Sequence, residues 1–522
     1  MKAIQTLIIK WKINLFWLVI PISKHYDDLL KKYNELYLLN TVRGVLYWDL
    51  NTYMPRNALQ FRTEQFNWIQ QAIHIRWVSH EFESLIKECE EDQTLNYIQK
   101  RNVELIRREH DNRTILPLEL VGALASQSNK TLELWKKAKA KNDFNSVVHE
   151  LEELFVLNMK RASLLAKAKE LDDPYEALID LRDPGFSVKK LSKIFDETKS
   201  FLVPFVKKCC NSPVQPDESI LTRHVSIKNQ KALVKDIAGF LEYNLNAGSI
   251  HEVEHPLTIG CGPEDIRVTV KYQDQIMPVV SATIHECGHA LDSLQRKKEW
   301  RRQPINSRSS PSFGESQSRF LQNIIGMSRE FWTFYYPHFQ KSTDGVFNDI
   351  SLEDFYFAIN AVKPGVSRMD ADEVTYCLHI IIRFEIERDL FAGLIEIKDL
   401  PQIWNAKYAE YLGVEVPTDT VGVMQDLHWF SQYWGYFYGY GIGDIMASQI
   451  TTALKLDLPT WQSLLQSGMF TPIRKWLAHN IHQKGAQFDA LDLIRDITGE
   501  PLTVKYFTSY LKEKYSELYH LG

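Results

Sequence analysis

Helical periodicity, rarely interrupted by turn residues, is the feature that most constrains how this chain can fold. Apolar residues recur every three to four positions from 24 to 170, for example in 26–37 and 150–167, and the pattern returns after 279. Only 23 Gly and 20 Pro are spread over 522 residues, too few to separate many short strands. The sequence therefore predicts a mainly α-helical protein.

One segment departs from this pattern. Residues 265–273 alternate strictly, with Ile266 and Val268 on one face and Arg267 and Thr269 on the other. This alternation predicts a β-strand with one polar face. The preceding stretch 251–262 is rich in Gly, Pro and His and is predicted to be a loop. We therefore expect a small sheet within the helical body.

Composition and charge exclude several classes of protein. The hydrophobic fraction is 44% and the charged fraction 24%, which is typical of a globular chain and excludes collagen, low-complexity disorder and a multi-span membrane protein. A net charge of −5 provides no broad basic field, so we expect no nucleic acid partner. No repeat or Gly/Ser linker divides the chain, and residues 26–522 are predicted to form a single domain.

Residues 1–25 form an apolar extension with two interpretations. Three lysines precede the apolar run 13–22, as in a signal peptide, but this run contains Asn14 and Pro21 and no small-residue cleavage site follows it. The alternative is a helix packed on the surface. The run is too short to span a bilayer, so no stable membrane insertion is expected. The six cysteines are scattered without a CxxC pair, which favours a reducing compartment and hence the cytoplasm.

The strongest chemical signal is His-Glu-Cys-Gly-His at 285–289. On a helix, His285 and His289 lie one turn apart on the same face, where two imidazoles can bind one Zn²⁺. Glu286 beside them can act as general base. The alternative is a pair of surface histidines, but apolar residues flank the motif on both sides and indicate a buried helix.

A catalytic zinc needs a third protein ligand. Gln295 stands where the longer metzincin pattern would place a third His, so that class is excluded. Asp292 shares the helix of both histidines, where a third ligand would be crowded. It is interpreted either as an acceptor for a ligand imidazole or as a surface charge. Glu315, opening a helix after a loop predicted at 304–314, would complete a His₂Glu site, although many other carboxylates lie downstream.

Six ordered segments resemble the carboxypeptidase Taq family of zinc metallocarboxypeptidases, and the resemblance extends from about Tyr26 to the end of the chain. The segments are His255-Pro256-Leu257, Asp265-Ile-Arg267-Val-Thr269, His285 to His289, Glu315-Ser-Gln317, Arg368-Met-Asp-Ala-Asp372 and Gly422-Val-Met-Gln-Asp-Leu-His428-Trp429.

The resemblance implies a helical body with a deep substrate channel, usually a homodimer, that releases single residues from peptide C-termini. It implies His285, His289 and Glu315 as Zn²⁺ ligands and Glu286 as base. Co²⁺ or Mn²⁺ can substitute in such a site. Arg368 matches the arginine that holds the free carboxylate of the substrate. The expected partners are therefore peptides with a free C-terminus.

Further roles combine the resemblance with the chemistry of the site. His428 and either Tyr436 or Tyr440 are placed to donate to the oxyanion, with a slight preference for Tyr436. His255 is interpreted as a substrate-side donor or as a loop histidine. The strand 265–273 can pair with an extended substrate, with Arg267 on its polar face, or Arg267 can tie the strand to the wall of the site.

Several residues carry a second interpretation. Arg368 can instead form a surface salt bridge with Asp370, Asp372 or Glu373, and Arg383 is interpreted as structural. Cys287 is expected to be a small buried apolar residue. The departures from the family pattern, none of which removes a ligand or the base, are Gly314 for a histidine, Ser367 for an apolar residue and Leu257 for a phenylalanine.

Two other functions compete with carboxypeptidase activity. A zinc oligopeptidase would share the metal site but cut inside peptides, without depending on a free C-terminal carboxylate or on Arg368. A non-catalytic peptide-binding relative would keep the fold, but it would have no need of Glu286. A structural zinc site is disfavoured, because such sites are closed and rich in Cys.

Overall fold

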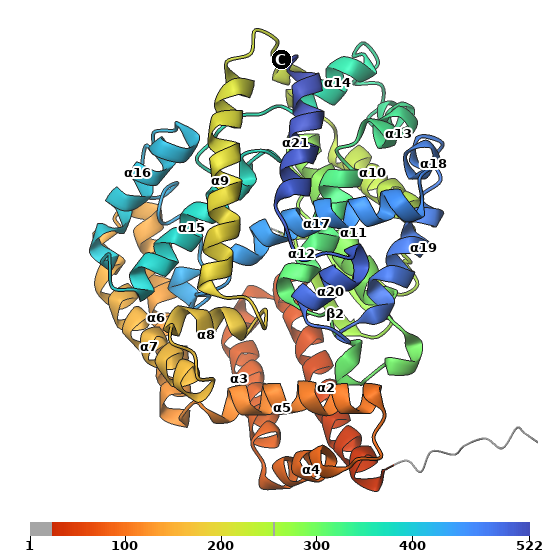
Figure 1. The fold of residues 1–522 in the computed structure, drawn as a ribbon. Coiled ribbons are helices and arrows are strands. Elements are labelled where there is room, and N and C mark those ends of the chain that lie inside the picture. The colour runs from red at the N-terminus through yellow and green to blue at the C-terminus, as the bar shows by residue number, and fades with distance from the viewer. Residues whose placement is uncertain (1–22, 254–255, 522) are drawn as a thin grey trace, which may run out of the picture.

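The structure, a computed structural model, describes residues 23–253 and 256–521 and confirms a mainly helical protein (Figure 1). The predicted extension up to residue 22, and His255, lie outside these described residues. The predicted helices at 26–37 and 150–167 are confirmed as parts of longer helices, which run over Lys24–Thr52 and Asn145–Ala168.

The helices of the first half are α2 (Lys24–Thr52), α3 (Leu59–Trp77), α4 (His80–Glu91), α5 (Tyr97–Thr114), α6 (Leu118–Lys141), α7 (Asn145–Ala168), α8 (Pro174–Asp180), α9 (Val188–Cys210) and α10 (Ile227–Phe240). The later helices are α11 (Ile276–Leu294), α12 (Pro311–Arg319), α13 (Arg329–Ser342), α14 (Leu352–Ile359), α15 (Tyr376–Phe391), α16 (Leu400–Leu412), α17 (Tyr438–Asp457), α18 (Trp461–Gln466), α19 (Thr471–Asn480), α20 (Ala490–Thr498) and α21 (Lys505–Leu518).

Helices α2 to α5 form a layer of their own at the bottom of Figure 1. Their buried apolar side chains, among them Leu29, Ile73 and Ile86, make a core separate from the main one. The layer meets the rest of the molecule where Trp48 of α2 packs with Ile259 of the sheet. The N-terminal layer therefore has its own packing, and it joins the body through this apolar contact and through polar contacts of α5, such as that of Arg101 with Asp489.

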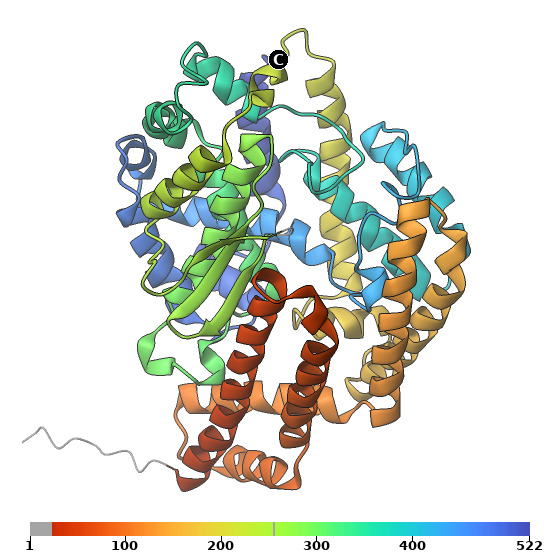
Figure 2. The ribbon, with the colours of Figure 1, turned by 180° about the vertical axis from the view of Figure 1, so that it is seen from behind.

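The sheet has three strands, β1 (Ile250–Glu252), β2 (Thr258–Gly262) and β3 (Asp265–Val270), seen in green in Figure 2. β3 lies in the middle, parallel to β1 and antiparallel to β2. The predicted strand is confirmed but ends at Val270. The predicted loop 251–262 is wrong in part, because it contains β2 and most of β1, both of which pair with β3.

The position of β3 also corrects the idea that this strand pairs with a substrate. Both of its edges already carry hydrogen bonds, to β1 on one side and to β2 on the other. A peptide strand cannot pair with an edge whose backbone groups are already hydrogen-bonded to a neighbouring strand. Pairing of β3 with an extended peptide is therefore excluded, and its polar face serves other contacts.

Three helices meet at the centre of the main core. α11 packs against β3 and α10, and α12 lies between α11 and α17. Glycines permit the close approach. A Cβ at Gly288 would lie 2.6 Å from Ser318 Cα of α12, and one at Gly443 would lie 2.7 Å from Glu315 Cβ. Side chains at these positions would separate α12 from its neighbours.

The start of α12 differs from the prediction. Ser310 caps the helix by accepting a hydrogen bond from the Phe313 N–H, and Pro311 occupies its first turn. Gly314 and Glu315 therefore lie inside the helix, and the predicted loop 304–314 is too long. Ser and Pro indicate a loop by composition, but they also begin helices.

Among the helices of the described part of the chain, none combines the length and apolarity that a membrane crossing requires.

Candidate active site

The three predicted metal ligands converge between α11 and α12. One ligand atom from each of His285, His289 and Glu315 lies within 4.8 Å of the others, and we call this set the metal cradle. Glu315 Oε2 is 3.8 Å from His285 Nε2 and 3.7 Å from His289 Nε2. Burial lowers the pKa of both imidazoles to about 3, so both are neutral with a lone pair available. This donor set fits a divalent metal with nitrogen and oxygen ligands.

The far side of the His285 ring is held by an amide. Gln322 Oε1 lies 2.8 Å from His285 Nδ1, and Gln322 Nε2 donates to Ser281 Oγ at 2.8 Å. Because the second contact orients the amide, its oxygen accepts from Nδ1 and leaves Nε2 for a metal. Sequence reasoning missed Gln322, which lies seven residues after Glu315 and outside both motifs.

Asp292 fits neither of its two interpretations. The residue is only 6% exposed, so it is not a surface charge. Its Oδ2 accepts from Arg296 Nη2 at 2.8 Å. His289 Nδ1 is buried and, within the described residues, makes no hydrogen bond of normal geometry. Asp292 therefore influences His289 by charge and not as a direct acceptor.

Glu286 lies buried beside the cradle. Thr258 Oγ1 of β2 donates to Glu286 Oε2 at 2.6 Å. Burial raises the pKa of Glu286 to about 8, and the nearby Glu315 charge adds to the effect. A divalent cation in the cradle would draw that pKa down again. Cys287, next in sequence, is fully buried among apolar residues, as expected.

Arg368 lies in a turn and is 9% exposed. Its Nε donates to Asp426 Oδ1 at 2.7 Å, while Arg383 Nε and Nη2 donate to Asp426 Oδ2 at 2.8 and 2.7 Å. We call Arg368 and Arg383, joined by Asp426, the arginine pair. The alternative partners Asp370, Asp372 and Glu373 are wrong, because the true partner is 58 residues away.

The arginine pair is electrostatically locked. Burial opposes the charges, but Asp426 raises the pKa of Arg368, and the two arginines lower the pKa of Asp426. Arg383 is fully buried and also donates to the His379 carbonyl, which supports its structural interpretation. Only Nε of the Arg368 side chain carries a hydrogen bond to the described residues, so its two Nη groups remain available.

His428 and the two candidate tyrosines gather near this pair. The His428 ring lies 4.3 Å from Phe437, 5.7 Å from Tyr436 and 6.4 Å from Tyr440, between ring centroids. Burial lowers the pKa of His428 to about 3, which keeps the ring neutral. Burial raises the pKa of both tyrosines, and the Glu315 carboxylate raises it further. The tyrosines are thus within electrostatic reach of the metal cradle.

A buried carboxylate that sequence reasoning missed holds the segment carrying His428. Glu387 of α15 accepts hydrogen bonds from Trp429 Nε1 at 2.7 Å, Gly435 N at 2.9 Å and Tyr175 Oη at 2.8 Å. These contacts bracket the chain between His428 and Tyr436. The sequence offers no signal that singles out Glu387 for this role, because α15 also carries Arg383, Glu385, Arg388 and Asp389.

Arg267 lies on β3 in different company. It donates to Asp265 through Nε and Nη2, both at 2.7 Å, and its guanidinium lies 5.3 Å from the Trp48 ring. Thr269 Oγ1 and N both donate to the Leu257 carbonyl at 3.0 Å. These contacts join β3 to α2 and to the segment before β2. Within the described residues, Arg267 makes no direct contact with the metal cradle.

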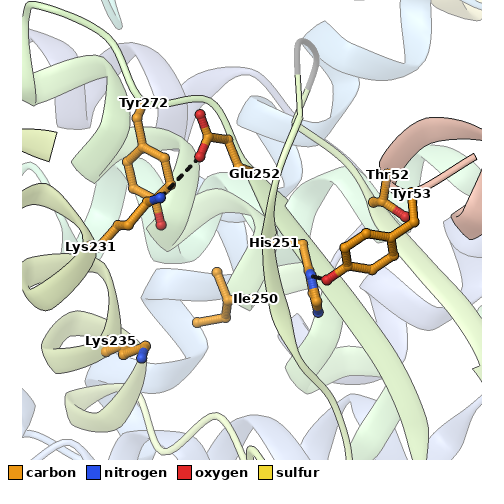
Figure 3. A pocket seen from close by; sticks show the side chains of 8 residues that line it. All are labelled: Thr52, Tyr53, Lys231, Lys235, Ile250, His251, Glu252 and Tyr272. Carbon is orange, nitrogen blue, oxygen red and sulfur yellow. Dashed lines mark hydrogen bonds and ion pairs between the residues drawn. The ribbon is translucent and has the colours of Figure 1, made fainter. Parts of the chain in front are cut away.

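A hollow of about 360 Å³ opens between the end of α2, α10 and β1 (Figure 3). Tyr53 Oη is hydrogen-bonded to His251 Nδ1, and Lys231 pairs with Glu252 at 3.1 Å. The hollow shares no residue with the metal cradle or the arginine pair. Its hydrogen bond between Tyr53 and His251 links the N-terminal layer to the sheet.

A helical body whose HExxH helix meets a carboxylate from the next helix defines a metallopeptidase. The family pattern described as carboxypeptidase Taq (M32) metallopeptidase matches residues 28–515. The chain therefore belongs to the carboxypeptidase Taq family, and it is a carboxypeptidase. The family membership implies a metal cofactor.

Named relatives agree over nearly the full length. Carboxypeptidase 1 of Bacillus subtilis (strain 168) is 36% identical over 501 residues, 96% of this chain and 99% of the relative. The crystal structure of an M32 carboxypeptidase from Deinococcus radiodurans R1 matches with a TM-score of 0.92 at 28% identity, over 95% of this chain and 100% of that one. A Pyrococcus furiosus carboxypeptidase, described as Apo-Mg, matches with a TM-score of 0.90 at 29% identity, over 94% and 99%.

Proposed function

We propose that this carboxypeptidase releases single amino acids from the C-termini of peptides with a Zn²⁺ held by His285, His289 and Glu315. The observation that carries the proposal is the convergence of these three donors beside Glu286. Tyr440 connects them to Arg368, because the Glu315 charge raises the pKa of Tyr440 and the ring of Tyr440 lies 5.3 Å from the Arg368 guanidinium. When bound, the metal supplies Lewis acidity toward the scissile carbonyl and activates water. Co²⁺ or Mn²⁺ is expected to substitute, since neutral imidazoles and one carboxylate suit all three ions.

Glu286 is the proposed general base. Thr258 engages its Oε2, so Oε1 is the oxygen that accepts the proton of the attacking water. The same proton then passes to the leaving amine, which becomes the free amino group of the released residue. The hydrogen bond from Thr258 keeps the carboxylate in one rotamer during both transfers.

Arg368 is the proposed clamp for the substrate's C-terminal carboxylate. Asp426 holds its Nε side, which fixes the guanidinium plane and leaves the Nη atoms to bind. His428 and a tyrosine, Tyr436 in preference to Tyr440, are proposed to donate to the oxyanion that develops on the scissile carbonyl. His255 and Arg267 remain proposed substrate-side residues, with Arg267 acting through the position of β3.

Mass spectrometry of one peptide in free-acid and C-terminally amidated forms tests the proposal. A ladder of single-residue losses from the free acid, with the amide intact, is the expected result. Internal cuts in both forms would instead favour the oligopeptidase alternative. No cleavage by protein that holds zinc and binds peptide would favour the non-catalytic relative. Arg368→Lys keeps the positive charge but loses the two parallel N–H groups that bind a carboxylate. It should therefore reduce the difference in cleavage rate between the free-acid and the amidated peptide.

We also propose a cytoplasmic homodimer in which residues 26–522 form one catalytic domain. All six cysteines are free, as in a reducing compartment. An apolar hollow of about 480 Å³ lies between α2 and α3, and Phe61 and Trp68 beside it are 65% and 67% exposed. Exposed apolar patches of this kind favour contact with a second copy. Sedimentation of the wild-type protein and of Trp68→Glu tests this assignment.

A further inference from the structure

Arg308 lies beside the metal cradle and has no role in the reaction proposed above. Its side chain is 36% exposed. The nearest carboxylate oxygen, Asp292 Oδ2, lies 3.8 Å from Arg308 Nε, and Arg296 already donates to that oxygen at 2.8 Å. Within the described residues, Arg308 makes no hydrogen bond. A guanidinium with free N–H groups is thus present at the edge of the candidate site.

Gly314 provides the space that this guanidinium occupies. A Cβ at position 314 would lie 2.5 Å from Arg308 Nη1 and 3.1 Å from its Cζ. The backbone at 314 is ordinary α-helix, so no unusual dihedral angle requires glycine there. The residue immediately before the metal ligand Glu315 therefore has no side chain, and the tip of Arg308 fills that place.

The charge of Arg308 reaches both sides of the cradle. It lowers the pKa of Glu286 and of His289 on α11, and it lowers the pKa of Tyr436 near the start of α17. These groups surround the place where the scissile bond must lie if Glu286 is the base. A peptide bound there would pass within electrostatic reach of Arg308.

Several neighbouring arginines already donate hydrogen bonds to a carboxylate, whereas Arg308 has only the 3.8 Å contact with Asp292. Arg296 pairs with Asp292, and Arg368 and Arg383 share Asp426. The side chain of Arg182 also makes no hydrogen bond to the described residues, and its guanidinium lies 4.7 Å from the centre of the Tyr436 ring. A guanidinium whose N–H groups donate no hydrogen bond prefers a carboxylate as its partner. Since Arg368 is assigned to the terminal carboxylate, Arg308 is available for a second one.

We propose that Arg308 is a specificity-determining residue that binds an acidic side chain of the peptide, at its last or penultimate residue. This inference rests on the proposed carboxypeptidase function. It predicts that the enzyme distinguishes Glu from Gln beside the scissile bond, and that Gly314 is required because a larger residue would displace the Arg308 guanidinium.

The test compares kcat/KM for two matched peptide pairs, with Glu or Gln at the last or at the penultimate position. In at least one pair the metal-loaded wild-type enzyme should prefer Glu by about three- to tenfold at low salt, and the preference should decline as salt rises. Arg308→Gln should reduce the ratio to about one. Gly314→Ala should also reduce the Glu/Gln ratio, because it displaces the Arg308 guanidinium without removing the arginine. Arg301→Gln, which removes an arginine paired with Glu264 at 2.7 Å, is the matched control and should keep the preference.

Equal rates for Glu and Gln in both pairs, or a preference that survives Arg308→Gln, would overturn the inference. If the wild-type enzyme cleaves none of the peptides, the proposed function fails instead. The same peptides are then titrated against zinc-loaded Glu286→Gln protein by tryptophan fluorescence. A Kd that is lower for Glu than for Gln, and no longer so with Arg308→Gln added, supports the inference, and equal Kd values overturn it.

Discussion

The metal cradle and the arginine pair are both buried, yet their polar atoms are satisfied in opposite ways. In the cradle, Glu315 Oε2 stays 3.7 and 3.8 Å from the two imidazole nitrogens, too far for hydrogen bonds. In the arginine pair, Asp426 accepts at 2.7 to 2.8 Å from both guanidinium groups. The facing atoms of the cradle are thus unpaired with one another, as the proposed cation site requires, whereas the arginine pair is complete without a ligand.

This difference indicates how the site divides its tasks. Among the atoms proposed to bind a metal, the two imidazole Nε2 atoms make no hydrogen bond to the described residues, and Glu315 Oε2 accepts one only from Ser318 Oγ at 3.2 Å. The neutral amide of Gln322 contacts His285 from its other side. Guanidinium atoms that hold a fixed position instead donate hydrogen bonds to a charged carboxylate, as in the arginine pair. Arg368 combines both conditions, because its Nε is fixed by Asp426 while its Nη groups are left open. Four substitutions test the contrast, in order of decreasing effect.

Glu286→Gln tests the cradle most severely. We expect kcat to fall by about 10²- to 10⁴-fold, because proton transfer to Oε1 is lost. Metal content should not change, since Glu286 is not one of the three converging donors. Steady-state peptide hydrolysis with metal analysis measures both. Glu264→Gln, at an exposed ion pair with Arg301, is the control and should keep full activity. Normal turnover by Glu286→Gln would assign the proton transfer to another group.

Asp426→Ala tests the arginine pair. Two buried guanidinium groups would lose their counter-ion, which costs about 3–5 kcal/mol of unfolding free energy. Urea unfolding followed by circular dichroism measures the shift in midpoint. The control is Asp349→Ala, which removes an exposed partner of Arg223 and should leave the midpoint unchanged. Equal midpoints for the two variants would show that the arginine pair does not depend on its carboxylate.

Gln322→Leu addresses metal affinity. His285 Nδ1 would lose its acceptor, and the ring its orientation, so the metal dissociation constant should rise by about 10- to 100-fold. Competition with a chelator measures this constant directly. Removing the metal from the wild-type protein should abolish hydrolysis, and restoring zinc should recover it. An unchanged dissociation constant in Gln322→Leu would mean that the amide does not orient His285.

Glu387→Gln should produce the smallest effect, which is a change in how steeply the unfolding free energy varies with pH. Burial raises the pKa of Glu387 from 4.5 to about 7, despite three hydrogen bonds that favour the charged form. Between these two values the native state binds more protons than the unfolded chain, so the contribution of Glu387 to the unfolding free energy falls as pH rises.

Glu387→Gln removes this titration. The decline in urea midpoint between about pH 5 and about pH 7.5 should therefore be flatter in the variant than in the wild-type protein. Glu396→Gln, at an exposed ion pair with Lys398, is the control and should keep the wild-type slope. A variant slope as steep as that of the wild-type protein would place the pH sensitivity in another buried carboxylate, such as Asp444 of α17, whose pKa burial raises to about 7.

Part of the candidate site could be predicted from short sequence motifs. The HExxH spacing placed His285, Glu286 and His289 on one helix. The structure brings the two histidines together with Glu315, and Glu286 is near enough for the Glu315 charge to raise its pKa. The choice of Glu315 depended on the resemblance to a family, because spacing alone could not rank it above other carboxylates. The helix that carries it begins earlier than composition suggested, since Ser310 and Pro311 act as a cap and a first turn.

Contacts between distant segments were not predictable in the same way. Asp426 stands in a quoted motif, but its partnership with Arg368 joins residues that neither periodicity nor spacing relates. Thr258 lies in a stretch interpreted as a loop, and it becomes part of a strand only by pairing with β3. Glu387 and Arg308 acquire their surroundings from helices and turns elsewhere in the chain.

By itself, the sequence determined the helical class, the buried HExxH helix and the family. These features are local, since helical periodicity and an i, i+4 pair of ligands need only a few consecutive residues. Only the tertiary structure decided which carboxylate locks Arg368, which amide orients His285 and what fills the space over Gly314. The physical reason is that burial and close approach select those partners, and both depend on how distant segments pack.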